Sequence, residues 1–370
     1  MTGRLSRRDA LRLGGLGVAG LASAAALGAC GSSGGGSSRG GSATDAAHLE
    51  PFVPDTSAGR PTGLPARVAW ASTADSEFFL ALGRGMQLAA SRRSLEYLTA
   101  TSGNDPARHA QQMGSFIDGG VAALAMQPLN QDADTPVLQR AIDRGICVQG
   151  IITAPSTLQI AASQYQIGYD QGKAAADYAR QHLGGEAKVV YFNLDTAAPA
   201  LRDRHRGVLA GLKTGGAGIQ VVSDVTVAEI SKRSGFNTMM SALQAHTDIN
   251  VVLGGDTIVV GAYQALKQAG KLSDDMFLSG VDGDRDALAL VKQGGAYKLS
   301  IGFAWHLMGY GLGEFAADWA EGKQVPRVMV AKGVSLGSAA DVAAFEAANA
   351  DPVTVFADRA RYAQYLPLYG

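Results

Sequence analysis

Basic residues are not in excess in this chain, which has 32 lysines and arginines against 33 aspartates and glutamates. Nucleic acid is therefore not an expected partner, because proteins that bind nucleic acids carry an excess of basic residues. Histidine is scarce too, and the six histidines show no metal-site spacing. No G-x-S-x-G motif or arrangement of Ser, His and Asp indicates a catalytic nucleophile. We expect no enzyme activity, no metal and no cofactor.

The residues that are present are typical of a globular protein, with 46% apolar and 18% charged residues in a length that leaves room for two domains. From residue 66 onward, short apolar runs alternate with segments of helical spacing, which predicts an α/β fold with doubly wound parallel sheets. The alternation restarts after a long helix expected over 166–183, so two lobes with a cleft between them are predicted. The expected strands cover 67–71, 95–100, 122–126, 147–152, 188–193, 219–223, 251–253 and 276–281.

Residues 250–284 hold the clearest strand–helix–strand pattern of the chain. Two aspartates, Asp256 and Asp282, each follow a buried strand. In open α/β sheets, ligands bind beyond the carboxyl ends of the strands, so both aspartates are candidate ligand contacts. The alternative is that each aspartate caps the helix that follows it.

Residues 1–29 have the features of a bacterial export signal. The twin arginine Arg7-Arg8 precedes a run without charges, from residue 13 to 29, that is too short and too weakly apolar for a stable membrane span. The twin arginine resembles a Tat signal, but Ala10 replaces the bulky apolar residue usual there, so Sec export remains an alternative.

Cysteine occurs only twice, as Cys30 and Cys147. Residues 27–30 resemble a lipobox, which implies that Cys30 is the acylated first residue of the mature protein; an ordinary signal peptide with an accidental cysteine is the alternative. The Gly/Ser-rich residues 31–42 are typical of a flexible tether. Cys147 lies in an apolar stretch and is expected in the core, without a disulfide.

Four motifs, in order, resemble those of ribose-type periplasmic binding proteins. Residues 72–79 resemble the family's S-T-x-x-N-P-F-F loop, and residues 202–207 resemble its R-x-R-x-x-G helix start. Residues 255–262 resemble N-D-x-x-x-x-G-A, and residues 280–283 match G-x-D-G. The resemblance covers residues 66–332. It implies a solute-binding lipoprotein of a bacterial ABC sugar importer, whose two lobes are joined by a three-strand hinge.

The resemblance also implies a division into domains, with hinge crossings near Gln166, Phe303 and Lys332. The N-terminal lobe would hold residues 66–165 and 303–332, and the C-terminal lobe 166–302 and 333–370. Residues 1–29 would be the signal peptide and 30–65 the lipidated cysteine and tether. The ligand contacts that the resemblance implies are Ser72, Ser76, Phe78, Phe79, Gln127, Thr153, Arg202, Asp256, Asp282 and Phe303.

Several of these positions depart from the family pattern. Ser76 and Gln127 replace asparagines, and the family's Asp-Arg pair falls on Ile152-Thr153. Gly255 replaces a further asparagine and Phe303 a glutamine. An unpaired buried polar group costs about 1–3 kcal/mol, so a site with fewer polar side chains favours a less hydroxylated, smaller or partly apolar ligand than a pyranose. A polyol or deoxy-sugar is the first candidate.

Some of these candidate ligand contacts have an alternative, structural role. Phe78 and Phe79 are neighbours on a helix and cannot both face one pocket well, and either could be core. Arg202 could pair locally with Asp203 or Asp195 instead of contacting ligand. Trp305 and His306 could line the cleft or pack between the lobes.

The expected partners are a small solute, the membrane permease of the importer, and the outer face of the cytoplasmic membrane through a lipid anchor; the protein itself is expected to be a monomer. One alternative is a receptor that presents solute to a membrane sensor, and a less favoured one is a secreted enzyme on the same fold. A lactose-repressor-type effector domain would share the fold, but residues 1–65 hold an export signal and tether where its DNA-binding helices would be.

Overall fold

The computed structural model describes residues 50–370, apart from 55–61, 153, 197–199 and 228. Cys30, the signal peptide, residues 31–42 and Thr153 therefore lie outside the described residues. Across the described ranges, no helix combines the length and the apolar character needed to cross a membrane. Cys147 is fully buried, as expected for a core residue.

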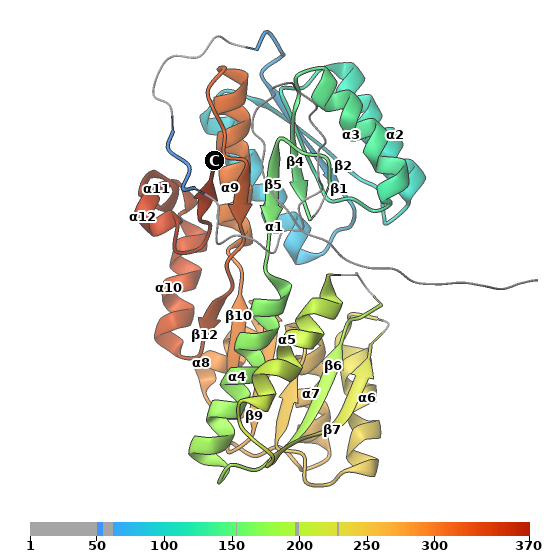
Figure 1. The fold of residues 1–370 in the computed structure, drawn as a ribbon, viewed down its shortest axis with the longest axis vertical. Helices are drawn as coiled ribbons and strands as arrows, with labels where there is room; N and C mark the ends of the chain where they lie inside the picture. Colours follow the sequence, from blue (N-terminus) through green and yellow to red (C-terminus); the bar gives the residue numbers. More distant parts are fainter. Residues whose placement is uncertain (1–49, 55–61, 153, 197–199, 228) are drawn as a thin grey trace, which may run out of the picture. The chain divides into compact units, whose positions relative to one another are not determined.

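Two β-sheets organise the described part of the chain (Figure 1). The first has the strand order β13-β11-β5-β4-β3-β1-β2 and the second β12-β10-β9-β8-β6-β7. All neighbours pair in parallel except β12 with β10 and β13 with β11. The predicted α/β fold with two doubly wound lobes is thus confirmed, with an antiparallel edge strand on each sheet. The strands are β1 Arg67–Ser72, β2 Glu96–Thr101, β3 Ala123–Met126, β4 Cys147–Ile151, β5 Leu158–Ala161, β6 Ala187–Asn193, β7 Ile219–Thr226, β8 Val251–Leu253, β9 Phe277–Asp282, β10 Tyr297–Gly302, β11 Val328–Val330, β12 Val334–Leu336 and β13 Leu368–Tyr369.

Helices cover both faces of the first sheet. Successive residues of a strand point to opposite faces, and β1 follows this rule. Ala69 and Ala71 belong to the core under α2 and α3, whereas Val68 and Trp70 belong to the core under α1 and α9. The helices are α1 Glu77–Arg92, α2 Pro106–Gly119, α3 Gln131–Asp143, α4 Gln164–His182, α5 Leu201–Lys213, α6 Lys232–Ala245, α7 Asp256–Gln268, α8 Arg285–Gln293, α9 Trp305–Ala320, α10 Ala339–Ala350, α11 Pro352–Ala357 and α12 Arg359–Tyr362.

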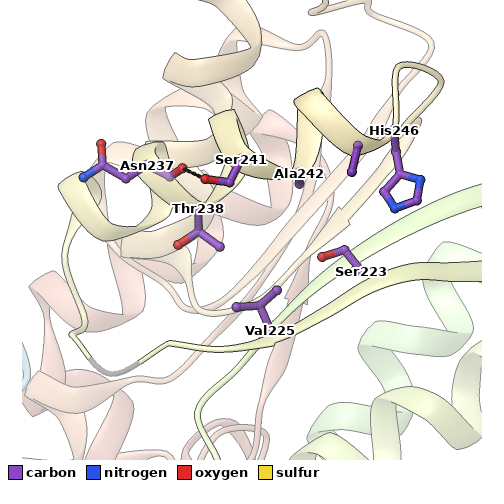
Figure 2. A pocket seen from close by; sticks show the side chains of 8 residues that line it. Ser223, Val225, Asn237, Thr238, Ser241, Ala242 and His246 are labelled. Atoms are coloured by element: carbon purple, nitrogen blue, oxygen red, sulfur yellow. Dashed lines mark hydrogen bonds between the residues drawn. The ribbon is translucent and has the colours of Figure 1, made fainter.

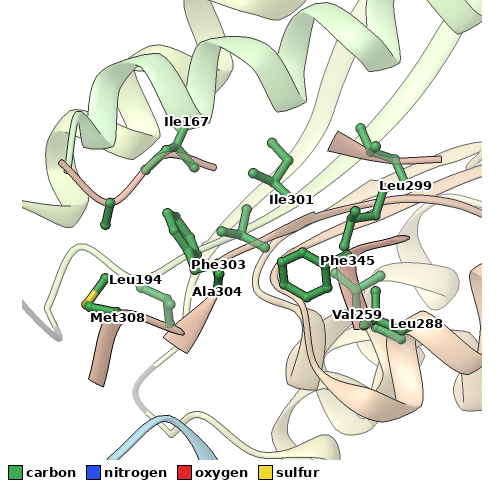
Figure 3. Close-up of a cluster of buried hydrophobic side chains, with 14 of the residues drawn as sticks. Ile167, Leu194, Val259, Leu288, Leu299, Ile301, Phe303, Ala304, Met308 and Phe345 are labelled. Carbon is green, nitrogen blue, oxygen red and sulfur yellow. The ribbon is translucent and has the colours of Figure 1, made fainter. Parts of the chain in front are cut away.

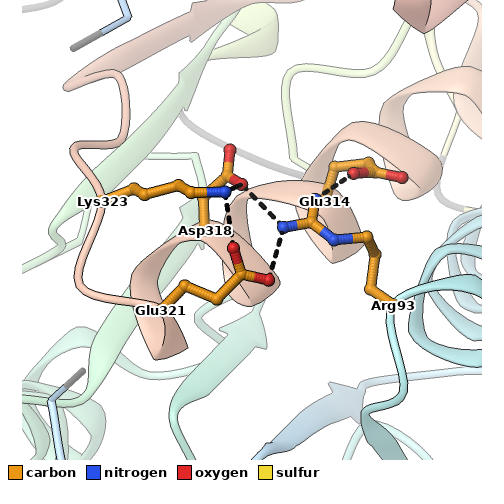
Figure 4. Close-up of polar contacts among 5 residues, drawn as sticks. All are labelled: Arg93, Glu314, Asp318, Glu321 and Lys323. Atoms are coloured by element: carbon orange, nitrogen blue, oxygen red, sulfur yellow. Dashed lines mark hydrogen bonds and ion pairs between the residues drawn. The ribbon is translucent and has the colours of Figure 1, made fainter. Parts of the chain in front are cut away.

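An ion-pair cluster fixes α1 to α9 (Figure 4). Arg93, at the end of α1, donates to Glu314 at 2.5 Å, Asp318 at 2.9 Å and Glu321 at 2.8 Å. Lys323 pairs with Glu321 at 2.5 Å. Helix α1 carries Phe78 and Phe79, and α9 begins at Trp305. By fixing the two helices to each other, this cluster helps to hold the two phenylalanines beside Trp305.

Glycines set the spacing of α4 and α5. A methyl group built on Gly168 would lie 2.0 Å from the carbonyl oxygen of Arg204, and one on Gly207 would lie 2.1 Å from that of Tyr165. The two helix backbones therefore touch directly, which leaves α5 little freedom to rotate. This contact fixes the direction in which the side chains at the start of α5 point.

The chain passes between the sheets after β5, after β10 and after β11. These passages lie near the predicted crossings at Gln166, Phe303 and Lys332. Strand β5 itself was not predicted, because its four residues, Leu158–Ala161, follow the turn residues Pro155 and Ser156 and were included in the loop before the long helix.

The C-terminal residues correct the predicted domain division. From β12, in the second sheet, the chain continues through α10, α11 and α12 and returns as β13 to the first sheet. Assigning all of residues 333–370 to the C-terminal lobe is therefore wrong. The tether predicted to extend to residue 65 is wrong for residues 50–52, because Pro51 pairs with Tyr369 and Phe52 donates to the carbonyl of Leu368 at 3.0 Å.

Candidate ligand-binding site

The candidate residues lie at the carboxyl ends of parallel strands in both lobes. Ser72 ends β1, Gln127 follows β3, and Asp282 ends β9. The helix starts beside these strand ends meet across the two lobes, where Arg285 of α8 lies 3.6 Å from Glu77 of α1. The structure thus brings the candidates from the two lobes to a common region.

Asp282 has a carboxylate free to accept a ligand. It is half-buried, its backbone φ is 123°, and its Oδ2 lies 3.9 Å from where a methyl group on Gly255 would sit. Within the described residues, no hydrogen bond to this carboxylate is formed. Burial raises its pKa to about 7, opposed by the charge of Arg204 and helped by Asp284 and Asp256. A ligand hydroxyl can therefore donate to this carboxylate without displacing a protein donor of the described residues.

Asp256, in contrast, is a structural residue. It is fully buried, and its Oδ2 accepts from the backbone N–H groups of Gly283 at 2.8 Å and Asp284 at 2.9 Å and from Ser300 Oγ at 2.7 Å. Its Oδ1 accepts from the hydroxyl of Tyr297 at 2.8 Å. These bonds are all made to protein groups, and those to Gly283 and Asp284 fix the loop that follows Asp282. Burial raises the pKa of Asp256 to about 6.

The arginine that acts on Asp282 is Arg204, not the predicted Arg202. Arg202 is exposed, and its Nε donates to the carbonyl of Asp195 at 3.4 Å, which is the local pairing considered as the alternative. Residues two apart on a helix point about 200° apart, so only one of the pair can face the strand ends. Arg204 is held by Gln164, whose Oε1 accepts from its Nε at 2.9 Å. Both arginines belong to the same motif, and the glycine contact of α5 with α4 was the signal that could have separated them.

His205 fastens the same helix to the loop after β6. Its Nδ1 lies 2.9 Å from Asp195 Oδ2 and its Nε2 lies 2.7 Å from Asp224 Oδ2. Two carboxylates can only accept, so both ring nitrogens donate and the imidazole is protonated. Burial alone would lower the pKa of His205, but the hydrogen bonds to the two aspartates raise it.

The aromatic candidates form one packed group. Phe79 is nearly buried, with its ring centroid 6.2 Å from that of Trp70. Phe78 stays half-buried and meets Trp305 edge-on at 4.6 Å. Phe303 is 3% exposed and stacks on Trp305 at 4.6 Å. Of the two neighbouring phenylalanines, Phe78 is thus the one with ring surface left for a ligand.

Phe303 is part of the core behind the site (Figure 3). Its ring lies among Ile167, Leu194, Ala304 and Met308, which come from α4, the loop after β6 and the start of α9. It therefore supports the site from behind instead of offering a surface to a ligand.

The remaining candidates of the first lobe differ in their availability. Ser72 is buried and its Oγ donates to the carbonyl of Ala74 at 2.8 Å, so it is already satisfied. Ser76 is exposed at the start of α1, and Gln127 is half-buried. Ile152 is 43% exposed with a φ of 69°, an unusual conformation for a β-branched residue that tends to occur at functional sites.

Two surface hollows of the described residues lie elsewhere. One measures about 460 Å³ and runs between β7 and α6, lined by residues such as Ser223, Thr238 and His246 (Figure 2). A second hollow of about 390 Å³ is lined by Phe52, Trp319 and residues near the C-terminus. Neither contains a candidate residue, and no cluster of potential metal ligands occurs among the residues described.

Comparison with known proteins finds relatives of this chain. The family described as "Periplasmic binding protein domain" matches residues 68–324. The ribose import binding protein of Bacillus subtilis is 29% identical over 265 residues, covering 70% of this chain and 83% of that protein. A putative rhizopine-binding protein of Rhizobium meliloti is 29% identical over 60% of this chain and 74% of its own length. The crystal structure of an ABC transporter solute-binding protein from Bacillus halodurans with bound myo-inositol has a TM-score of 0.66 at 21% identity, covering 79% of this chain and 99% of that one.

Proposed function

Because this chain belongs to the periplasmic binding protein family, we propose that it captures one small sugar or polyol between the strand ends of its two lobes and delivers it to an ABC importer. The family consists of extracytoplasmic binding proteins of importers and not of enzymes, so turnover of the solute is not expected. The observation that carries the proposal is Asp282, a half-buried carboxylate without a hydrogen-bond partner among the described residues.

The surroundings of Asp282 suggest how a solute would be held. Asp282 accepts from ligand hydroxyls, and Arg204, oriented by Gln164, donates to ligand oxygens. Phe78 and Trp305 offer ring surface for the C–H face of a sugar or polyol. Relatives named for ribose import and rhizopine binding, and the related fold holding myo-inositol, support this ligand class.

The polar groups of the site are few, which favours a ligand that is less hydroxylated, smaller or more apolar than a pyranose. Ile152 presents an apolar side chain at the end of β4, and Gly255 presents none beside Asp282. Phe303 is buried behind the site and offers no polar atom. We therefore favour a polyol or a deoxy-sugar.

A screen by thermal unfolding and calorimetry tests the proposal. Ribose, xylitol, myo-inositol and deoxy-sugars are added one at a time, and a solute at 100 times its Kd should stabilise the protein by about 2.7 kcal/mol. Asp282→Ala should abolish the shift of any active solute while the protein stays folded. A full shift retained in this variant would show that the solute binds elsewhere.

We further propose that the mature protein is a monomer anchored through Cys30 to the outer face of the cytoplasmic membrane. The lipobox resemblance supports the anchor, and export by Tat or Sec would precede it. Delivery to a membrane sensor instead of a permease remains the second candidate. The family places the protein outside the cytoplasm in either case.

A further inference from the structure

The segment of residues 338–370, here called the C-terminal segment, lies outside the family match of residues 68–324. It contains α10, α11, α12 and β13 and connects the two lobes. Helix α10 packs against α8 and β12 of the second lobe and against α9 of the first. Such a connection adds a fourth link to the three hinge passages.

The segment touches the hinge passage after β10 at two points. Phe345 of α10 lies on the last residue of β10, because a methyl group on Gly302 would be 3.0 Å from its Cζ. One helical turn further on, the carbonyl of Asn349 lies 2.7 Å from Nδ1 of His306, at the start of α9. These two contacts hold the backbone on both sides of Phe303.

The segment also touches the passage after β11. The backbone N–H of Lys332, between β11 and β12, donates to the carbonyl of Tyr365 at 3.0 Å, and that of Val330 donates to Pro367 at 2.9 Å. Tyr362 is buried with its hydroxyl 3.8 Å from the sulfur of Met329. Two of the three hinge passages are therefore held by this one segment.

Phe345 reaches the ligand site as well. A methyl group on Gly283 would lie 3.5 Å from its Cε1, so the ring covers the backbone directly after Asp282. The opposite support of this loop is Asp256, which accepts from the N–H groups of Gly283 and Asp284. The phenyl ring and the buried carboxylate together fix the position of Asp282.

We infer that the C-terminal segment is a hinge brace and that Phe345 is a positioning residue for the ligand site, an inference that rests on Asp282 being the ligand contact. Closing two lobes requires backbone rotation at the hinge passages. The segment restrains that rotation at two passages, and through Phe345 it links the hinge to the loop carrying Asp282. Loosening Phe345 should release both the loop and the hinge.

Hydrogen exchange resolved to single amides tests the inference without any solute. Phe345→Leu should speed the exchange of the Gly283 and Asp284 amides at least about tenfold, because their hydrogen bonds to Asp256 open more often. The matched control is Phe277→Leu, since Phe277 is similarly buried but lies outside the C-terminal segment, at the opposite end of β9 from Asp282, where it packs on Tyr178 of α4. The control should lower the Tm comparably and leave the two amides unchanged.

A binding arm uses myo-inositol, ribose and xylitol with both variants. Phe345→Leu should raise the Kd of whichever of them binds the parent at least about fivefold, and Phe277→Leu should not. If none of the three binds the parent, ribose and these two polyols are excluded as the solute, while the exchange result still decides on the brace. Should Phe345→Leu not fold, Phe345→Met provides the smaller change. Equal exchange at Gly283 and Asp284 in the parent and the Phe345 variant would overturn the inference.

Discussion

The ionisation of Asp282 should make ligand binding depend on pH in the range around neutrality. The pKa of this carboxylate is raised to about 7, chiefly by burial. A ligand that donates hydroxyl hydrogens to Asp282 favours the charged form, so binding lowers the pKa and releases a proton. Affinity is therefore full above pH 7 and falls as the pH drops through that value.

The magnitude follows from the ionised fraction. With a pKa of about 7, roughly nine-tenths of the carboxylate is charged at pH 8 and roughly one-tenth at pH 6. If only the charged form accepts the ligand, the Kd should rise about tenfold between these two values, or about 1.4 kcal/mol. Isothermal calorimetry in two buffers of different ionisation heat measures both the Kd and the released proton.

Two neighbours need control. Asp256 also has a raised pKa, about 6, but it is fully hydrogen-bonded to protein. His205 changes in the opposite sense, because loss of its proton as the pH rises would loosen α5 and weaken binding. Asp282→Asn keeps both neighbours and removes only the Asp282 titration, so it should bind more weakly and lose the tenfold gain in affinity from pH 6 to pH 8. A Kd for the parent that is the same at both pH values, or an Asn variant that keeps the tenfold change, would refute the reasoning.

Three further predictions concern the arginines, the helix contact and the anchor. Arg204→Ala should weaken solute binding roughly tenfold to a hundredfold in calorimetry, since charged-group hydrogen bonds contribute about 1.5–3 kcal/mol. Arg202→Ala should change the Kd less than threefold. A larger loss with Arg202→Ala than with Arg204→Ala would identify Arg202 as the ligand contact. Gly168→Ala should cost about 1–3 kcal/mol in urea unfolding, because its methyl group meets the backbone of α5, while Gly119→Ala, whose methyl group would meet open space, should cost nothing. Cys30→Ala should move the protein from the membrane to the soluble fraction in cell fractionation; unchanged partition would contradict the lipid anchor.

The fold could be predicted where residue pattern decides it. Strands such as Val251–Leu253 are short, apolar and β-branched and run directly into glycine, and they lie where the sequence placed them. Strand β13 could not be predicted, because its two residues become a strand only through pairing with β11 and Pro51. Pairing with distant segments leaves no local periodicity in the sequence.

The choice between Arg202 and Arg204 shows a different limit of prediction from sequence. The motif of residues 202–207 contains two candidate arginines, and sequence resemblance cannot tell which one faces the strand ends. The answer depends on the rotation of α5, which is set by close contacts at Gly168 and Gly207. Helix rotation is thus a packing property, even though the glycines that fix it are visible in the sequence.

The two aspartates of residues 250–284 follow the same sequence pattern and take opposite roles, and glycines explain the difference. A methyl group on Gly280 would lie 1.8 Å from Asp256 Oδ1, so only glycine leaves the space in which that carboxylate reaches Tyr297. Gly255 leaves the space over which Asp282 lies, and no donor occupies it among the described residues. The carboxylate of Asp256 therefore lies among protein donors, whereas the carboxylate of Asp282 faces space without a donor from the described residues. For an aspartate that follows a strand, the space left by the facing glycine therefore decides the role. If that space contains protein donors, the aspartate is structural, and if it is open, the aspartate can contact a ligand.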